Sequence, residues 1–201
     1  MRKPTSVRGL ERFGRERLSK SFFMRDFLYS EIASLNGFDN VPSDPELAIA
    51  AGKQLCEQLL EPLQDAFGRI AVRSAYRSPQ VNEFGNKHNL SCASNASNAA
   101  GHIWDLRDAE NCVGATACIV IPSFYDRFGA EGDWKRLAWW IHDHLPYSEM
   151  EFFLTYWAFN LSWHERPKRR ISNWIETPRT LSEPGMSNNG IGHEQEWRGI
   201  L

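Results

Sequence analysis

The stretch SDPELAIAAGKQLCEQLLEPLQDAFGRIAVR, residues 43–73, holds the clearest structural pattern in this chain. Apolar residues recur at every fourth position, at Leu55, Leu59, Leu63 and Phe67. This spacing predicts the buried face of an α-helix, and Ser43 with Glu46 three residues later forms a capping box at its start. Gly68 is expected to end the helix, and residues 69–73 are expected to follow as a buried strand. The stretch therefore predicts a long capped helix that runs directly into a strand.

Two weaker helical patterns precede this stretch. Residues 22–35 predict a second short helix, ended by Asn36 and Gly37. Residues 1–20 mix basic and acidic side chains, with apolar positions spaced as in a modest amphipathic helix. We expect this front helix to pack on the domain with a solvated face; a helix for a partner or a membrane surface is the alternative.

The rest of the chain is richer in strand patterns. Residues 77–100 hold many Asn and Ser and little periodicity, so we expect a long functional loop with room for one short helix. Strands are expected at residues 101–106, 115–121, 151–156 and 159–163, and a helix at residues 134–144. Early helices packed on a later, mainly antiparallel sheet predict the α+β class. The expected parts are an N-terminal helix (1–20), a single domain (21–175) and a loop-like tail (176–201).

The composition limits the classes of function. With 201 residues, 42% of them hydrophobic and 12% aromatic, the chain has ample material for one packed core. A net charge of −2 gives no basic field, so we expect no nucleic-acid partner. No run approaches the ~20 apolar residues of a membrane span. The charged first residues show no secretory signal, which favours a cytoplasmic protein with reduced thiols, or one released in the manner of a phage lysin.

Three polar segments stand out together. The first, SAYRSPQVN at residues 74–82, directly follows the predicted strand. The second is NAAGHIWD at 98–105, and the third is NLSWHERP at 160–167. In this order and at these separations they resemble the zinc D-alanyl-D-alanine carboxypeptidases (DD-peptidases), whose fold is shared with the Hedgehog signalling domain. The resemblance covers about residues 21–171 and implies that fold.

The resemblance also implies a site. In the family, a His and an Asp seven residues apart, with a later His after a Trp, hold the zinc. Matched by position, Asp105 and His164 are the expected metal ligands. Arg77, in the Tyr-Arg-Ser turn, is the expected catalytic residue that holds a substrate carboxylate or carbonyl. Asn98 occupies the position of the first His, where we expect it either to contact substrate or to cap the loop.

Two departures from the family pattern affect this site. An amide oxygen is a poor zinc ligand beside imidazole, so Asp105 and His164 alone would make a weak site. His102 lies three residues before Asp105 on the expected strand, and strand alternation points it away. His88 could swing in from the long loop.

The general base is the second departure, because the expected acid three positions before His164 is Leu161. Glu151, on the strand predicted just before that of His164, is the better candidate for this base. Glu165 follows His164 directly and is expected to face the other side of the sheet.

Other histidines are expected to be structural. His142, Asp143 and His144 end a helix, where the dipole favours cationic His, and residues two apart do not converge on one ion. His193, in a tail rich in Gly and Asn, is expected to be solvated. The basic run at residues 168–170 predicts either a solvated turn or a rim that receives an anionic substrate.

The resemblance thus favours a zinc-dependent, peptidase-like hydrolase that acts on D-alanyl or peptidoglycan-type peptides. Two alternatives stay open. One is a degenerate member that binds a peptide or a partner protein without cleaving it. The other is a metal protein with altered ligands and different chemistry.

Overall fold

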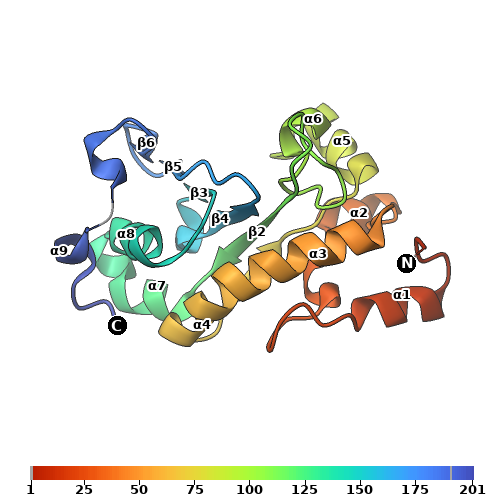
Figure 1. Ribbon diagram of the computed structural model, residues 1–201, viewed down its shortest axis with the longest axis horizontal. Coiled ribbons are helices and arrows are strands. Elements are labelled where there is room, and N and C mark those ends of the chain that lie inside the picture. Colours follow the sequence, from red (N-terminus) through yellow and green to blue (C-terminus); the bar gives the residue numbers. More distant parts are fainter. Residues whose placement is uncertain (1, 191) are drawn as a thin grey trace.

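The computed structural model describes residues 2–190 and 192–201. Its α-helices are α1 (Val7–Gly14), α2 (Glu31–Asn36), α3 (Pro45–Leu55), α4 (Glu61–Phe67), α5 (Pro79–Lys87), α6 (Asn95–Asn98), α7 (Pro122–Phe128), α8 (Lys135–His144) and α9 (Glu194–Trp197) (Figure 1). Its strands are β1 (Ala71–Ser74), β2 (Gly114–Val120), β3 (Glu149–Phe152), β4 (Phe159–His164), β5 (Arg170–Asn173) and β6 (Thr180–Ser182). The remaining helical segments are the π-helix η2 (Cys56–Leu60) and the 3-10 turns η1 (Met24–Phe27), η3 (Gly129–Glu131), η4 (Thr155–Trp157) and η5 (Ser187–Asn189).

The long helix predicted from the opening stretch is confirmed. α3, η2 and α4 follow one another without a break, and Gly68 ends α4 at a φ of 82°, which glycine adopts readily. The capping box is wrong by one residue. Asp44 is the N-cap, because its carboxylate accepts the amide of Leu47 at 3.0 Å and Pro45 takes the first helical position. The amide of Ser43 donates to Asp105 instead.

The six strands form one mixed sheet in the order β1-β2-β4-β3-β5-β6. β3 and β5 run parallel, and the other neighbouring pairs are antiparallel. The α+β class is therefore confirmed. The strands predicted at 115–121 and 159–163 are present as β2 and β4, and the helix predicted at 134–144 is present as α8.

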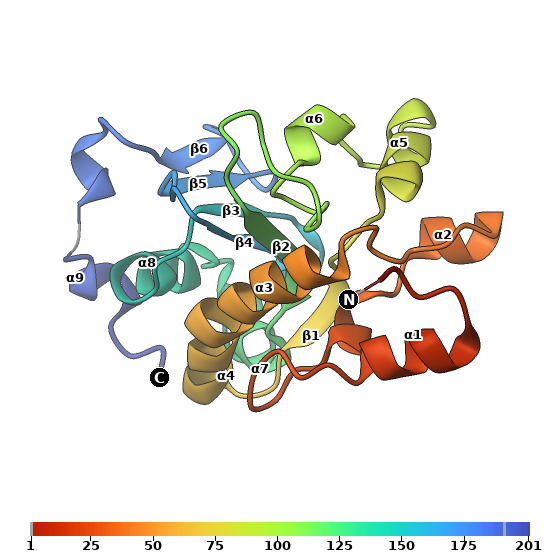
Figure 2. The ribbon, with the colours of Figure 1, turned by 45° about the vertical axis from the view of Figure 1, so that its right-hand side comes forward.

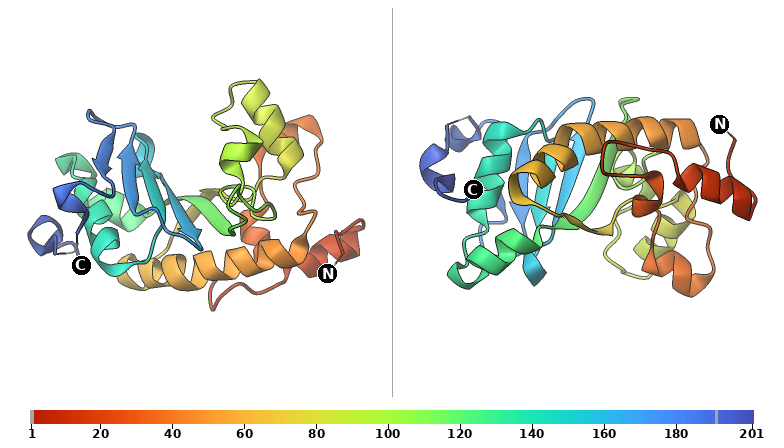
Figure 3. Two further views of the ribbon diagram at one scale, coloured as in Figure 1. Left: turned by 45° about the horizontal axis from the view of Figure 1, so that its top comes forward. Right: turned by 90° about the horizontal axis from the view of Figure 1, so that it is seen from below.

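Alternation along the strands gives the sheet an apolar face and a polar face. The apolar face presents the buried side chains of Ala115, Ala117, Ile119, Met150, Phe152, Phe159 and Leu161. The α3–α4 rod crosses this face (Figure 3), and the ring of Trp134, just before α8, packs on Phe152 with centroids 4.7 Å apart. The core therefore lies between the sheet and these helices, which leaves the opposite face free for polar groups.

Residues 101–106 form a turn in place of the predicted strand. Ala100 has a φ of 53°, and its amide donates to the carbonyl of Leu106 at 2.7 Å, so the chain closes on itself. The carbonyl of Gly101 accepts the amide of Thr116 at 3.0 Å, beside β2 and beyond the end of β1. Fully buried Trp104 fixes the turn by donating to the carbonyl of Thr116. These local bonds replace the ladder that a strand would need.

Other segments differ from expectation. The strand expected at residues 151–156 ends at Phe152, and Thr155–Trp157 form the turn η4. The tail expected to be loop-like holds β6 and α9. Residues 77–100 hold two helices, α5 and α6, each capped by a serine hydroxyl, that of Ser78 or Ser94. Residues 22–35 form the turn η1 and then the short helix α2, because Ser30 caps α2 and separates the two.

Both ends of the chain contribute to the main core. Phe13 of α1 is fully buried, and Ile200 near the C-terminus is 3% exposed. None of the helices in the described part of the chain is long and apolar enough to cross a membrane.

Candidate functional site

Polar side chains gather on the face of the sheet opposite α3. On β3 and β4, Glu151 lies opposite Asn160, and Glu149 lies opposite Ser162. On β2, the hydroxyl of Thr116 contacts that of Ser162 at 2.7 Å. The apolar partners of these residues point the other way because successive strand residues alternate between faces. The strand pattern alone therefore builds one polar wall.

A second wall comes from the segment that leads from α6 into β2. Figure 2 shows this segment running from α6 to β2, and Asn98, Gly101 and His102 are its residues that line the wall. Together the walls enclose a cavity of about 210 Å³. Its lining consists of Ser97, Asn98, Gly101, His102, Thr116, Glu149, Met150, Glu151, Asn160, Ser162, Arg170 and Ser172. We call this cavity the polar cleft.

Asn98 is held by a chain of side-chain amides. Its side-chain nitrogen donates to Asn82 Oδ1 at 2.8 Å, and Asn82 is fully buried. Asn82 in turn donates to the carbonyl of Ala93 and to Asn95. Since the amide nitrogen of Asn98 faces Asn82, its oxygen is the end left for a ligand. The structure brings Asn98 and Glu151 into the same cleft.

His102 has one anchored ring nitrogen and one free one. Nδ1 lies 2.7 Å from the carbonyl of Ala75, so it carries the proton and donates. Nε2 is buried and has no hydrogen-bond partner within the described residues. Asn160 lies beside the ring, and its contact raises the pKa of His102, against the larger lowering caused by burial. The side-chain amide of Asn160 donates to Glu151 at 3.1 Å and not to His102 Nε2.

The free nitrogen of His102 is an acceptor at neutral pH. Burial, more than the nearby Arg77 guanidinium, lowers the pKa of His102 to about 3. The expectation that His102 points away from the site is therefore wrong, because strand alternation does not hold in a turn. His102 lines the cleft, and Asp105 leaves it.

Glu151 is the cleft carboxylate without a cationic partner in the described part of the chain. It accepts from the side chains of Asn160 and Trp174, at 3.1 and 2.8 Å, and both donors are neutral. Glu149, by contrast, forms an ion pair with Lys168 at 3.3 Å. The negative charge of Glu151 is thus available to an incoming group.

Asp105 caps the start of α3. Its carboxylate accepts the amides of Ser43 and Asp44 at 2.6 and 3.3 Å and the hydroxyl of Tyr76 at 3.0 Å. Arg77 lies beside the cleft and not in its wall. Its side chain donates to Cys92 Sγ, and its amide donates to the carbonyl of His102. For Asp105, the hydrogen bonds from Ser43, Asp44 and Tyr76 offset the cost of placing a carboxylate among apolar residues, so no bound ion is required.

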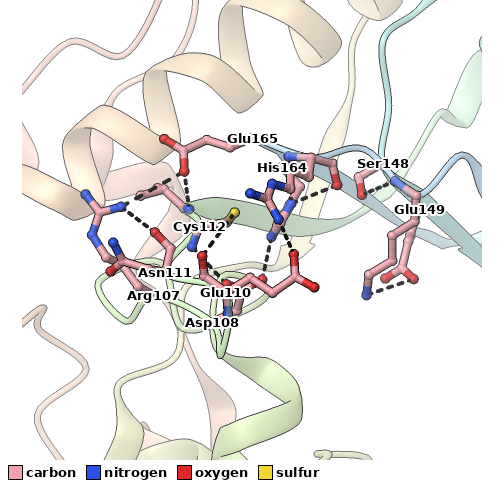
Figure 4. Close-up of polar contacts among 12 residues, drawn as sticks. Arg107, Asp108, Glu110, Asn111, Cys112, Ser148, Glu149, His164 and Glu165 are labelled. Atoms are coloured by element: carbon pink, nitrogen blue, oxygen red, sulfur yellow. Dashed lines mark hydrogen bonds and ion pairs between the residues drawn. The ribbon is translucent and has the colours of Figure 1, made fainter.

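His164 belongs to a different network, at the far end of β4. Figure 4 shows its ring turned toward the loop at residues 107–112, where Nε2 contacts Asp108 at 3.1 Å. Nδ1 accepts the amide of Arg166 at 3.0 Å. Glu151 lies opposite Asn160, four residues and about 13 Å along the strand from His164. Glu151 is therefore too far to serve as a base for an ion on His164.

The two remaining alternatives also lie outside the cleft. Glu165 accepts the amide of Val113 at 2.7 Å (Figure 4), and exposed His88 lies against Phe84 with ring centroids 4.2 Å apart. Of the basic run, Arg170 lines the cleft, while Arg169 donates to carbonyls near the end of α8.

The predicted zinc ligands do not fit one ion. The ligand atoms of Asp105 and of His164 are engaged in separate hydrogen-bond networks. Asn98 and Asn160 supply amides, which are weak ligands for zinc. With one imidazole, His102, the cleft lacks the set of N and carboxylate donors that zinc sites use.

A different cluster in the described residues could hold a metal ion. His142 and Asp143 of α8 meet His193 of the tail, with one ligand atom from each lying within 4.8 Å of the others. Burial, reinforced by the Arg169 guanidinium, lowers the pKa of His142. His144 does not belong to this cluster, and its Nδ1 lies 2.8 Å from the carbonyl of Trp140. The expectation of a solvated His193 is wrong, because the tail returns to α8.

Sequence reasoning missed His102, Asn160 and His193 as polar centres. The period-2 alternation of Asn160 and Ser162 with Phe159 and Leu161 is a signal that marks the polar face. His102 and His193 depend on a turn and on a returning tail, which leave no such pattern. Comparison of the chain with protein-family models, with curated proteins and with solved structures gives no match.

Proposed function

We propose that this protein binds a polar, amine-bearing peptide in the polar cleft and does not hydrolyse it. The observation that carries the proposal is that two acceptors line the same cleft. One is the Glu151 carboxylate, which is held by neutral donors, and the other is His102 Nε2, which has no hydrogen-bond partner in the described residues. Both groups accept hydrogen bonds, and one of them is negatively charged. A cleft of this kind favours a ligand end rich in N–H donors, above all an ammonium group.

The neighbouring side chains support the same ligand class. The amide nitrogens of Asn98 and Asn160 donate to protein acceptors, so the two amide oxygens add further acceptors. A volume of 210 Å³ corresponds to roughly seven waters at about 30 Å³ each, enough for the end of a peptide side chain. A buried acceptor left unpaired costs free energy, so a matching donor gains affinity by satisfying it.

The resemblance of residues 74–82, 98–105 and 160–167 to the zinc D-alanyl-D-alanine carboxypeptidases supports a peptide as ligand and a Hedgehog/DD-peptidase-like fold. The hydrolytic reading of that resemblance needs a zinc ion on Asp105 and His164. The separate networks of these two residues argue against it. We therefore propose the degenerate, binding form of this fold.

The test is calorimetric binding of a lysine-containing peptidoglycan stem peptide, compared with the same peptide acetylated on the lysine amine. We expect the free amine to bind at least about tenfold more tightly, since a desolvated charge-assisted hydrogen bond contributes about 1.5–3 kcal/mol. Glu151→Gln should abolish this preference. Glu149→Gln is the matched control and should keep it, because Lys168 already pairs with Glu149.

Mass spectrometry of the same mixtures provides the second readout. The intact peptide should persist after prolonged incubation with the protein. Release of D-alanine that is sensitive to chelation would restore the hydrolase reading, and equal binding of both peptides would reject the acceptor site.

A further inference from the structure

The cluster of His142, Asp143 and His193 joins the end of α8 to the C-terminal tail. His142 Nε2 faces the tail and lies 2.9 Å from the carbonyl of Gly190. His193 Nδ1 lies 2.8 Å from Asp143 Oδ1. The three side chains are largely enclosed: His142 is 1% exposed, and the side chains of Asp143 and His193 are 9% and 14% exposed.

Each of these three side chains is also anchored by its other polar atom. His142 Nδ1 contacts the hydroxyl of buried Tyr147 at 2.6 Å. His193 Nε2 faces the carbonyl of Asn188 at 3.2 Å. Asp143 Oδ2 accepts from the amide of His193 and the indole of Trp197, at 2.7 and 2.8 Å. Metal-binding histidines and carboxylates characteristically have such outer partners, which fix the ring orientation and the protonated nitrogen.

From this geometry we propose that His142 Nε2, Asp143 Oδ1 and His193 Nδ1 bind a divalent transition-metal ion, with Zn²⁺ as the probe. Two imidazoles and one carboxylate form a donor set used by zinc and by non-haem metal sites. The carbonyl of Gly190, next to His142 Nε2, or a water completes the coordination.

The proton balance is simple. The ion replaces the proton between His142 Nε2 and Gly190, and that proton moves to Nδ1, where the Tyr147 oxygen accepts it. At His193 the ion replaces the proton on Nδ1, and that proton moves to Nε2, where the carbonyl of Asn188 accepts it. Ligand atoms on one tetrahedral ion lie about 3.4 Å apart. His193 Nδ1 and Asp143 Oδ1, at 2.8 Å, must therefore move slightly apart, and any pair as far apart as 4.8 Å must close by about 1.4 Å. The ion therefore cross-links the tail to α8.

The experiment is titration of the full chain, stripped of metal with a chelator, with Zn²⁺ in a calorimeter. We expect one ion per chain, with affinity reduced at least about 100-fold by His193→Ala or Asp143→Ala. Tyr147→Phe removes only an outer partner and should cost about 10- to 100-fold. His88→Ala, an exposed histidine outside the cluster, is the matched control and should bind as the unmodified chain does.

Two measurements on the unmodified chain keep the test independent of variant folding. Co²⁺ should give visible absorption bands of a site with nitrogen and oxygen ligands. Hydrogen exchange of residues 192–198 should slow when Zn²⁺ is added. Zinc binding that survives both variants, or no binding at millimolar zinc, would show that the cluster is only a hydrogen-bonded clip.

Discussion

The polar cleft and the α8–tail cluster both place histidine beside a carboxylate, yet they differ in how many ring nitrogens converge. In the cleft, His102 offers one free nitrogen, and its neighbours Asn98 and Asn160 offer amides. In the cluster, two imidazoles and one carboxylate face one point, and each is anchored from behind. The first arrangement suits a hydrogen-bond donor, and the second suits a metal ion. The cluster differs from the cleft because several anchored ligand atoms converge on one point. The presence of a His near an Asp or Glu does not by itself make a metal site.

The two regions are also assembled differently. Strand alternation and register build one wall of the cleft, so its polarity follows from β2, β3 and β4. The cluster depends on Asp143 and His193, which are fifty residues apart in sequence and are joined by hydrogen bonds. We therefore expect the cleft to respond to changes in the sheet, and the cluster to changes in the tail.

The largest expected effect comes from Gly114→Ala, which should damage the cleft and spare the cluster. A Cβ at this position would lie 2.1 Å from the carbonyl oxygen of Ala100 and 2.9 Å from that of Trp163. Both are backbone atoms that cannot turn aside, so we expect a loss of about 3 kcal/mol in the free energy of unfolding. Urea denaturation measures this loss.

Gly190→Ala is the control, because a Cβ there meets open space and the φ is −75°. Its free energy of unfolding should change by less than about 0.5 kcal/mol. Zinc binding by folded Gly114→Ala should be unchanged. Equal stability of the two variants would contradict the close approach of residues 100–101 to β2.

A smaller effect, on pH dependence, should follow from His102→Asn. The folded pKa of His102 is about 3, against an ordinary 6.5, so between these values only the unfolded chain binds the proton. Stability is therefore complete above pH 6.5 and falls by about 1.4 kcal/mol per pH unit as the pH drops toward 3. Asn can still donate to the carbonyl of Ala75 but does not titrate.

Denaturation at pH 7.5 and pH 5.0 tests this directly. Over this interval, the unmodified chain should lose about 2 kcal/mol more than His102→Asn. The same loss in both proteins would mean that His102 is protonated in the folded state, and the free acceptor in the cleft would be refuted.

The smallest effect is expected from His164→Ala, a substitution of a zinc ligand implied by the resemblance. The substitution removes the hydrogen bonds to Asp108 and Arg166 and some packing. Together these losses should lower the free energy of unfolding by about 1 kcal/mol. Zinc affinity and peptide affinity should both stay within about twofold of the unmodified chain. A large loss of zinc affinity would show that zinc binds at His164 on β4 and would contradict the assignment of the metal site to the α8–tail cluster.

The sequence predicted much of the fold because its elements carry strong local patterns. The recurrence of apolar residues at every fourth position from Leu55 to Phe67 predicted the α3–α4 rod, and the alternation of apolar and polar residues predicted β4. The strand expected at residues 101–106 was wrong, because its apolar residues serve a closed turn in which Trp104 is buried. Local hydrogen bonding in that turn is invisible to a periodicity argument.

By itself, the sequence determined which faces of the helices and strands are apolar, because burial of those faces drives folding and their spacing is local. Only the tertiary structure decided which polar atoms converge. A positive φ at Ala100 turns His102 into the cleft and Asp105 out of it, and the returning tail brings His193 to α8. Convergence of this kind depends on contacts between distant segments, which no local pattern encodes.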